Sequence, residues 1–127
     1  MSYLLDTYAL IEWYDQGNSR YRPYFDPGVK RYLTKLTLLE FYHYVYHNRG
    51  KELAEKYYSH LKRHAEIVEL TEDVLKKSAV FRSEMLKKGK RFSYADCVNY
   101  VSAKELGAKL LTGDREFEKM ENVELVR

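Results

Sequence analysis

Four acidic residues lie where predicted strands end or predicted helices begin, a placement that could support metal-dependent chemistry: Asp6, Glu40, Asp96 and Asp114. Asp6 follows the apolar run 3–5, and Asp114 comes just after the run 109–112. Glu40 and Asp96 each stand three residues after a hydroxyl residue, Thr37 or Ser93, that could cap a helix. Because the carboxyl ends of parallel strands and the first turns of the helices that follow them share one edge of a sheet, we expect the four acids to converge.

Four carboxylates in one crevice could not all remain ionised and unpaired, because their repulsion would raise some of their pKa values. A divalent cation removes this conflict, and a set of oxygen ligands favours Mg²⁺ or Mn²⁺ over zinc or copper. Such an ion lowers the pKa of water and stabilises negative charge on a reacting phosphodiester. The four acids therefore indicate metal-assisted hydrolysis of phosphodiester bonds.

Each acid also has a structural interpretation that needs no chemistry. Asp6 could end a strand in a turn, and Glu40 could be the second half of a capping box that begins at Thr37. Asp96 could complement its helix dipole, and Asp114 could form a turn or cap a helix. For each residue alone the structural interpretation is the more common one, and it is their shared place at one sheet edge that favours a site.

The elements that would position these residues alternate between short apolar runs and amphipathic stretches. Strands are expected at 3–5, 31–35, 67–70, 109–112 and 123–126. Helices are expected at 37–48, 52–63, 71–88, 93–106 and 115–120, with Gly50, Gly89 and Gly107 ending three of them. Residues 16–28, which contain both prolines, are typical of a loop or a short helical excursion. This alternation predicts an α/β fold with a mostly parallel central sheet.

Length and composition predict one globular domain over residues 1–127. A net charge of +3 permits RNA binding without requiring it. The single cysteine, Cys97, excludes a disulfide framework and a cysteine-based zinc site. No apolar run is long enough for a membrane span, and the N-terminus lacks the basic start of a signal peptide, so we expect a cytoplasmic protein.

Four motifs, in order, resemble those of PIN-domain ribonucleases. The first is LLDTYALI at 4–11, which contains Asp6, and the second is LLEF at 38–41, which contains Glu40. The third is YAD at 94–96, and the fourth, after AKELG at 103–107, is LTGD at 111–114. The resemblance covers essentially the whole chain, and the interval between Asp96 and Asp114, a helix plus a strand, is as in that family.

The resemblance implies a Rossmann-like, three-layer α/β/α sandwich. It implies that the four acids bind Mg²⁺ or Mn²⁺ and orient the attacking water, and that the Thr112 hydroxyl helps to hold that water or the Asp6 carboxylate. Compact proteins of this family are most often VapC-type toxins that cut tRNA or rRNA, pair with a small antitoxin and form homodimers. The alternative is a PIN-domain protein that processes or binds RNA without being a toxin.

A basic cluster precedes the helix that carries Asp96: Lys87, Lys88, Lys90 and Arg91. Together with Arg115 it could hold an RNA backbone, with an affinity that falls as salt rises; solvated cations at a helix end are an equally good interpretation. Asn99, one turn after Asp96, stands where the family usually has an apolar residue. It either faces the site or, in the interpretation that we favour, forms hydrogen bonds within the core.

Other classes of protein fit the sequence less well. His43 and His47 have a zinc-binding spacing, as do His60 and His64, but the glutamate of an H-E-x-x-H motif is missing. Phosphatases with an aspartyl nucleophile need a second aspartate two residues after Asp6, where Tyr8 stands. A protein that only binds a partner has no need of four converging acids, and divalent ions should not stabilise its fold.

Overall fold

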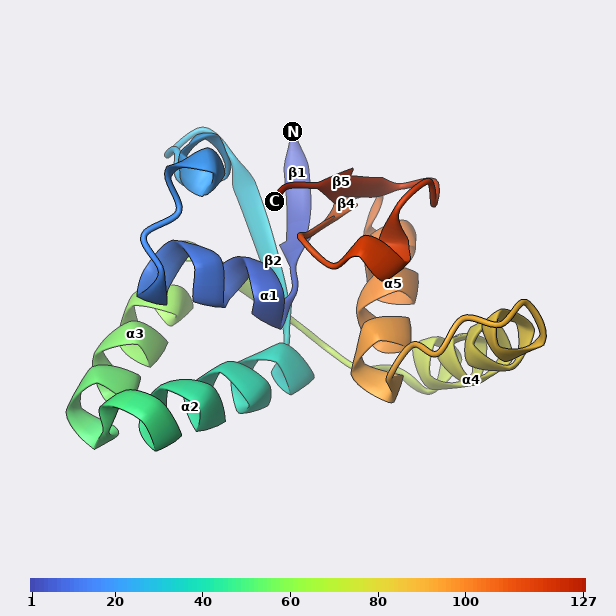
Figure 1. Ribbon diagram of the computed structural model, residues 1–127, viewed down its shortest axis with the longest axis horizontal. Coiled ribbons are helices and arrows are strands. Elements are labelled where there is room, and N and C mark those ends of the chain that lie inside the picture. Colours follow the sequence, from blue (N-terminus) through green and yellow to red (C-terminus); the bar gives the residue numbers. More distant parts are fainter.

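A five-stranded parallel sheet forms the centre of the molecule in the computed structural model, which describes residues 1–127 (Figure 1). The strands are β1 (Ser2–Leu5), β2 (Lys30–Thr34), β3 (Glu66–Val68), β4 (Lys109–Thr112) and β5 (Val123–Leu125). They lie in the order β3-β2-β1-β4-β5, and every neighbouring pair is parallel. The predicted α/β fold with a parallel sheet is confirmed.

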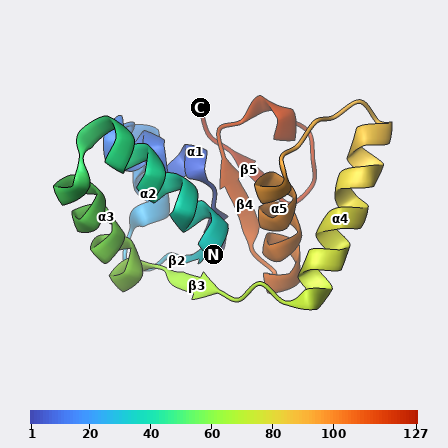
Figure 2. The ribbon, with the colours of Figure 1, turned by 90° about the horizontal axis from the view of Figure 1, so that it is seen from below.

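Helices cover both faces of this sheet and give the molecule three layers (Figures 1 and 2). One side holds α1 (Thr7–Leu10), which continues as a π-helical turn over Ile11–Asp15, together with α2 (Lys35–Arg49) and α3 (Lys51–His64). On the other side α5 (Tyr94–Leu106) packs on β1 and β4, and α4 (Glu72–Lys87) packs against α5. Two 3-10 helices complete the fold, η2 (Ser19–Phe25) and η3 (Arg115–Phe117). None of the helices combines the length and apolar composition that crossing a bilayer needs.

The central strand β1 shows why both faces of the sheet need helices. Leu4 and Leu5 are both fully buried, but successive residues of a strand point to opposite faces. Leu5 joins a core cluster that contains Phe41 of α2, whereas Leu4 joins a second cluster that contains Tyr100 of α5. A strand that is apolar on both sides is what a parallel sheet between two helical layers requires.

One predicted helix start is wrong. Thr34, and not Thr37, is the N-cap of α2, and its hydroxyl accepts a hydrogen bond from the Thr37 backbone N–H at 3.3 Å. The helix begins directly where β2 ends, so Glu40 lies in the second turn and takes no part in a capping box. The other predicted cap is confirmed, because Ser93 and Asp96 form a reciprocal capping box at the start of α5. That helix ends, as predicted, at Gly107, which adopts the left-handed backbone conformation at φ 68°.

Candidate active site

The four acids singled out in the sequence line one pocket at the carboxyl edge of the sheet. Strands β1 and β4 pair through Leu5 and Leu111, so Asp6 and Asp114 emerge at the same edge. Helices α2 and α5 bring Glu40 and Asp96 to it. The pocket has a volume of about 450 Å³, and no lysine or arginine is among its ten lining residues: Asp6, Thr7, Tyr8, Ile11, Glu40, His43, Tyr44, Asp96, Asn99 and Asp114.

Asp6 is the deepest of the four acids, with 6% of its surface exposed. Its Oδ1 accepts a hydrogen bond from the Ala9 backbone N–H at 2.9 Å, which makes it the N-cap of α1. Burial raises its pKa from 3.8 to about 7, the nearby Thr112 hydroxyl and the hydrogen bond from Ala9 oppose this shift, and the negative charges of Asp96 and Asp114 add to it. The buried Thr112 hydroxyl accepts a hydrogen bond from the Asp114 N–H at 3.0 Å, and its predicted role beside the Asp6 carboxylate stays a prediction.

Asp96 and Asp114 are half-buried and also begin helices. Asp96 Oδ2 accepts a hydrogen bond from the Ser93 N–H, and Asp114 Oδ1 accepts one from the Glu116 N–H, each at 3.0 Å. These caps engage one oxygen of each carboxylate and leave the other without a backbone donor. Burial raises the pKa of Asp96, and the nearby charges of Asp114 and Glu40 raise it further. The repulsion expected among converging carboxylates is therefore present.

Glu40 is exposed at the rim of the pocket. Its Oε1 accepts a hydrogen bond from the Thr7 hydroxyl at 2.6 Å. This contact joins α2 to the start of α1, directly after Asp6. Since Thr34 caps α2, the capping-box interpretation of Glu40 is wrong, and its carboxylate is committed to the pocket and not to the helix end.

A buried hydrogen-bond network sets the two helices that carry Glu40 and Asp96 relative to one another. Asn99 of α5 is only 2% exposed; its Oδ1 accepts a hydrogen bond from the Thr34 hydroxyl at 2.7 Å, and its Nδ2 donates one to the Thr37 hydroxyl at 3.0 Å. The interpretation of Asn99 as a residue bonded within the core is confirmed. Because Thr37 belongs to α2, the hydrogen bond from Asn99 joins the two helices that carry Glu40 and Asp96.

Several residues that line or support the pocket are not among those predicted from the sequence. Thr7 directly follows Asp6, and His43 lies one helical turn after Glu40, so helical spacing from that acid could have identified the histidine. Thr34 was placed within a strand, and nothing in the sequence marked it as the cap. Without the strand boundary, Thr34 and Thr37 are equivalent candidates for the cap.

Gly113, between Thr112 and Asp114, is closely packed against other parts of the chain. A Cβ at this position would lie 2.6 Å from the Val126 carbonyl oxygen and would overlap the ring of Tyr8. Since backbone oxygens cannot move aside as a flexible side chain can, only glycine fits without a shift of the chain. The LTGD motif therefore has a steric basis in addition to its chemistry.

The predicted RNA-binding residues lie outside this pocket. Lys87 and Lys88 stand at the end of α4, which projects from the side of the molecule (Figures 1 and 2). Lys90 donates a hydrogen bond to the Glu116 carbonyl at 2.9 Å, so its loop lies beside η3, where Arg115 begins. Arg91 and Arg115 are exposed. Lys90 thus lies beside the segment that contains Arg115, and none of the five predicted RNA-binding residues lines the acidic pocket.

The acidic residues suit a hard divalent cation by their chemistry, although no three of them already form a closed ligand set. All the donors are carboxylate oxygens, which Mg²⁺ and Mn²⁺ prefer. No lysine or arginine of the lining balances their negative charge, and burial disfavours the ionised form of Asp6. Asp6, Glu40, Asp96 and Asp114 are the residues that would hold such an ion.

Comparison with known proteins gives one family and one fold. A family model described as PIN domain matches residues 3–123. No curated protein matches the chain. Among solved structures, the chain is similar to VapBC2 from Rickettsia felis bound to a promoter DNA fragment, with a TM-score of 0.82 and 19% identity over 99% of this chain and 98% of the other.

Two further solved structures have the same fold. VapBC-1 from nontypeable Haemophilus influenzae has a TM-score of 0.77 and 17% identity over 99% of this chain and 97% of the other. The sarcin-ricin-loop-cleaving toxin VapC20 from Mycobacterium tuberculosis has a TM-score of 0.75 and 15% identity over 97% of this chain and 98% of the other. At these identities the likeness concerns the fold.

Proposed function

The chain belongs to the PIN domain family, and we propose on that basis that it is a Mg²⁺- or Mn²⁺-dependent endoribonuclease that hydrolyses RNA phosphodiester bonds. The observation that carries this proposal is the pocket in which Asp6, Glu40, Asp96 and Asp114 meet without a balancing lysine or arginine. Such a pocket is costly for the protein alone, because burial and repulsion disfavour the ionised acids.

Each residue of the pocket has a distinct role in this proposal. A divalent cation there would supply positive charge against the phosphodiester and make water more acidic. Asp6 provides the deepest carboxylate, which caps α1 through the Ala9 N–H and lies near the Thr112 hydroxyl. Thr7 orients Glu40 at the rim, where an RNA strand would enter. Asn99 acts at a distance, by fixing the two helices from which Glu40 and Asp96 project.

We further propose that the protein is the VapC-type toxin of a toxin–antitoxin pair and acts on tRNA or rRNA as a cytoplasmic homodimer. The likeness to VapBC from Rickettsia felis and Haemophilus influenzae supports a cognate antitoxin as partner. Exposed apolar side chains on α2, Leu39 at 67% and Tyr46 at 53%, offer a surface for such a partner. A small neighbouring gene that encodes a DNA-binding antitoxin would separate this proposal from that of a PIN-domain protein that is not a toxin.

The test is cleavage of a panel of tRNAs and rRNA fragments by the purified protein with Mn²⁺ or Mg²⁺, and with EDTA. The informative variant is Asp96→Asn, because asparagine keeps the cap of α5 and removes the charge. Asp26→Asn is the matched control, since Asp26 lies in an exposed loop outside the pocket. We expect discrete cuts that require the metal, persist in the control and disappear in Asp96→Asn. Cuts that survive EDTA or the Asp96 substitution would contradict the site.

A further inference from the structure

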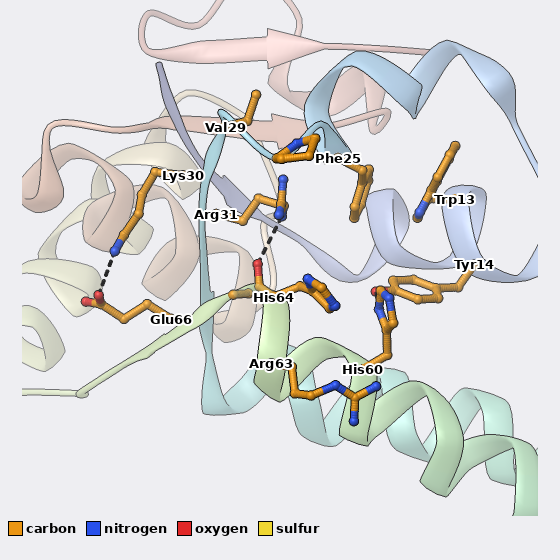
Figure 3. Close-up of a pocket in the computed structure, with 12 residues that line it drawn as sticks. Trp13, Tyr14, Phe25, Val29, Lys30, Arg31, His60, Arg63, His64 and Glu66 are labelled. Carbon is orange, nitrogen blue, oxygen red and sulfur yellow. Dashed lines mark hydrogen bonds and ion pairs between the residues drawn. The ribbon is translucent and has the colours of Figure 1, made fainter.

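A second pocket, larger than the acidic one, lies at the opposite end of the sheet. It is formed where β2 begins and α3 ends, and it shares no lining residue with the acidic pocket. Its volume is about 870 Å³, within the range of small-molecule sites. We call it the basic pocket and define it by six of its lining residues: Trp13, Phe25, Arg31, His60, Arg63 and His64. Figure 3 shows these side chains grouped around one cavity.

We propose that the basic pocket binds a nucleotide, with its phosphate group at the arginines and its aromatic base beside the aromatic side chains. Such a ligand is either a free nucleotide or one residue of an RNA strand, and the chemistry of recognition is the same for both. The inference goes beyond the proposed nuclease activity and does not rest on it.

The first support is positive charge that no acid in the pocket neutralises. Arg31 is only 8% exposed, and its guanidinium donates hydrogen bonds to three backbone carbonyls, at 3.1 Å to His64, 3.2 Å to Tyr24 and 3.0 Å to Asp26. These contacts hold the group in place without cancelling its charge. They leave one of its nitrogens, Nη2, without a hydrogen-bond partner in the protein.

The remaining charges strengthen this field. Arg63 forms no ion pair, and the single acid of the lining, Glu66, is paired with Lys30 at 3.0 Å, to one side of the cavity (Figure 3). Burial lowers the pKa of His60, and the positive charges of His64, Arg63 and Arg31 lower it further. An anion in this pocket would relieve the repulsion, whereas a metal cation would add to it.

The second support is the aromatic wall beside these cations. Trp13 and Phe25 stack with their ring centroids 4.9 Å apart and an interplanar angle of 12°. The rings of His60 and His64 lie 4.2 Å apart, and the Arg31 guanidinium lies 5.7 Å from the centre of the Phe25 ring. Aromatic side chains next to arginines are typical of sites that hold a nucleobase together with its phosphate.

The test uses the fluorescence of Trp13, which is the only tryptophan of the chain and lines the basic pocket. The protein is titrated in EDTA, so that no metal-dependent cleavage contributes, with inorganic phosphate, adenosine 5′-monophosphate and a short single-stranded RNA. We expect a saturable change with the nucleotide at lower concentrations than with phosphate. RNA that binds more tightly than the nucleotide identifies a strand as the ligand, and weaker RNA binding identifies the free nucleotide.

The informative variant is Arg63→Gln, because Arg63 is exposed and supports no other contact of the fold. Loss of a charge-assisted contact to phosphate should weaken nucleotide binding by about tenfold or more. Lys56→Gln, an exposed position on the same helix outside the pocket, is the control and should bind as the wild type does. No saturable change with any probe, or equal binding in Arg63→Gln, would overturn the proposal. So would a Trp13 signal that depends on protein concentration alone, which would mean that a second copy covers this face.

Discussion

Replacing Asp6 with asparagine should stabilise the metal-free protein, and by an amount that grows with pH. Asp6 ionises near 3.8 in the unfolded chain and near 7 in the folded protein, because burial and neighbouring acids oppose its charge. Between these values the folded protein keeps a proton that the unfolded chain has released. Folding stability therefore falls as pH rises from about 4 to about 7, and the full cost remains above that range.

The size of the effect follows from the two pKa values. An aspartate shifted by this amount costs the folded state about 0.5 kcal/mol at pH 4, about 3 kcal/mol at pH 6 and about 4 kcal/mol at pH 8. Asparagine does not titrate, and it can still accept the hydrogen bond from the Ala9 N–H that begins α1. The gain in unfolding free energy over wild type should therefore follow these same values.

The assay is urea unfolding in EDTA at the three pH values, for wild type, Asp6→Asn and the control Asp26→Asn. The control removes one negative charge from an exposed loop and should change stability little at any pH. This prediction follows because burial and neighbouring charges disfavour the ionised carboxylate. It would be refuted if Asp6→Asn gained the same unfolding free energy at every pH, or gained none at pH 8. The same variant should have lost RNA cleavage, so stability and activity would move in opposite directions.

Four further outcomes are expected. Mn²⁺ should raise the unfolding temperature of the wild type at pH 8, and Asp114→Asn, which keeps its cap, should lose most of this gain. Asn99→Leu leaves two buried threonine hydroxyls without their amide partner and should cost about 1–3 kcal/mol in urea unfolding. Gly113→Ala forces a shift of the chain and should cost about 1–3 kcal/mol in the same assay. Arg91→Gln together with Arg115→Gln should weaken RNA binding and reduce its salt dependence by about one counterion for each charge removed, measured by filter binding across a salt series.

The sheet edge was predictable because the signals for it are local. Apolar runs mark the strands, and Ser93 with Asp96 has the three-residue spacing of a capping box, which the structure contains. The same rule failed at α2, where Thr34 and Thr37 both precede helical residues. Which threonine caps the helix depends on where β2 stops, and that is decided by pairing with β1 and β3, not by the local sequence.

The burial of each acid and the convergence of side chains from separate elements could not be predicted from local sequence patterns. That Asp6 is buried while Glu40 is exposed follows from how α1 and α2 cover the end of the sheet. The basic pocket draws on residues from the π-helical turn Ile11–Asp15 and from η2, β2 and α3, which have no shared motif. The sequence can indicate that several acids stand at the ends of strands or starts of helices. How deeply each is buried, and which side chains meet in one pocket, is decided by the tertiary packing.

The structural interpretation of the acids and the proposed chemical one are compatible. For Asp6, Asp96 and Asp114, the same carboxylate can serve a helix start and the proposed site. Asp6 and Asp114 are N-caps and Asp96 completes the capping box that Ser93 begins, so the backbone N–H groups that they satisfy also fix each carboxylate at the sheet edge. A helix N-terminus favours a negative charge, which offsets part of the repulsion that convergence creates. Because an asparagine can satisfy the same N–H groups, substitution by asparagine removes the charge and keeps the fold, whereas alanine would remove both. The caps therefore explain how one chain can fold with four carboxylates at one edge, and they identify the substitution that separates folding from chemistry.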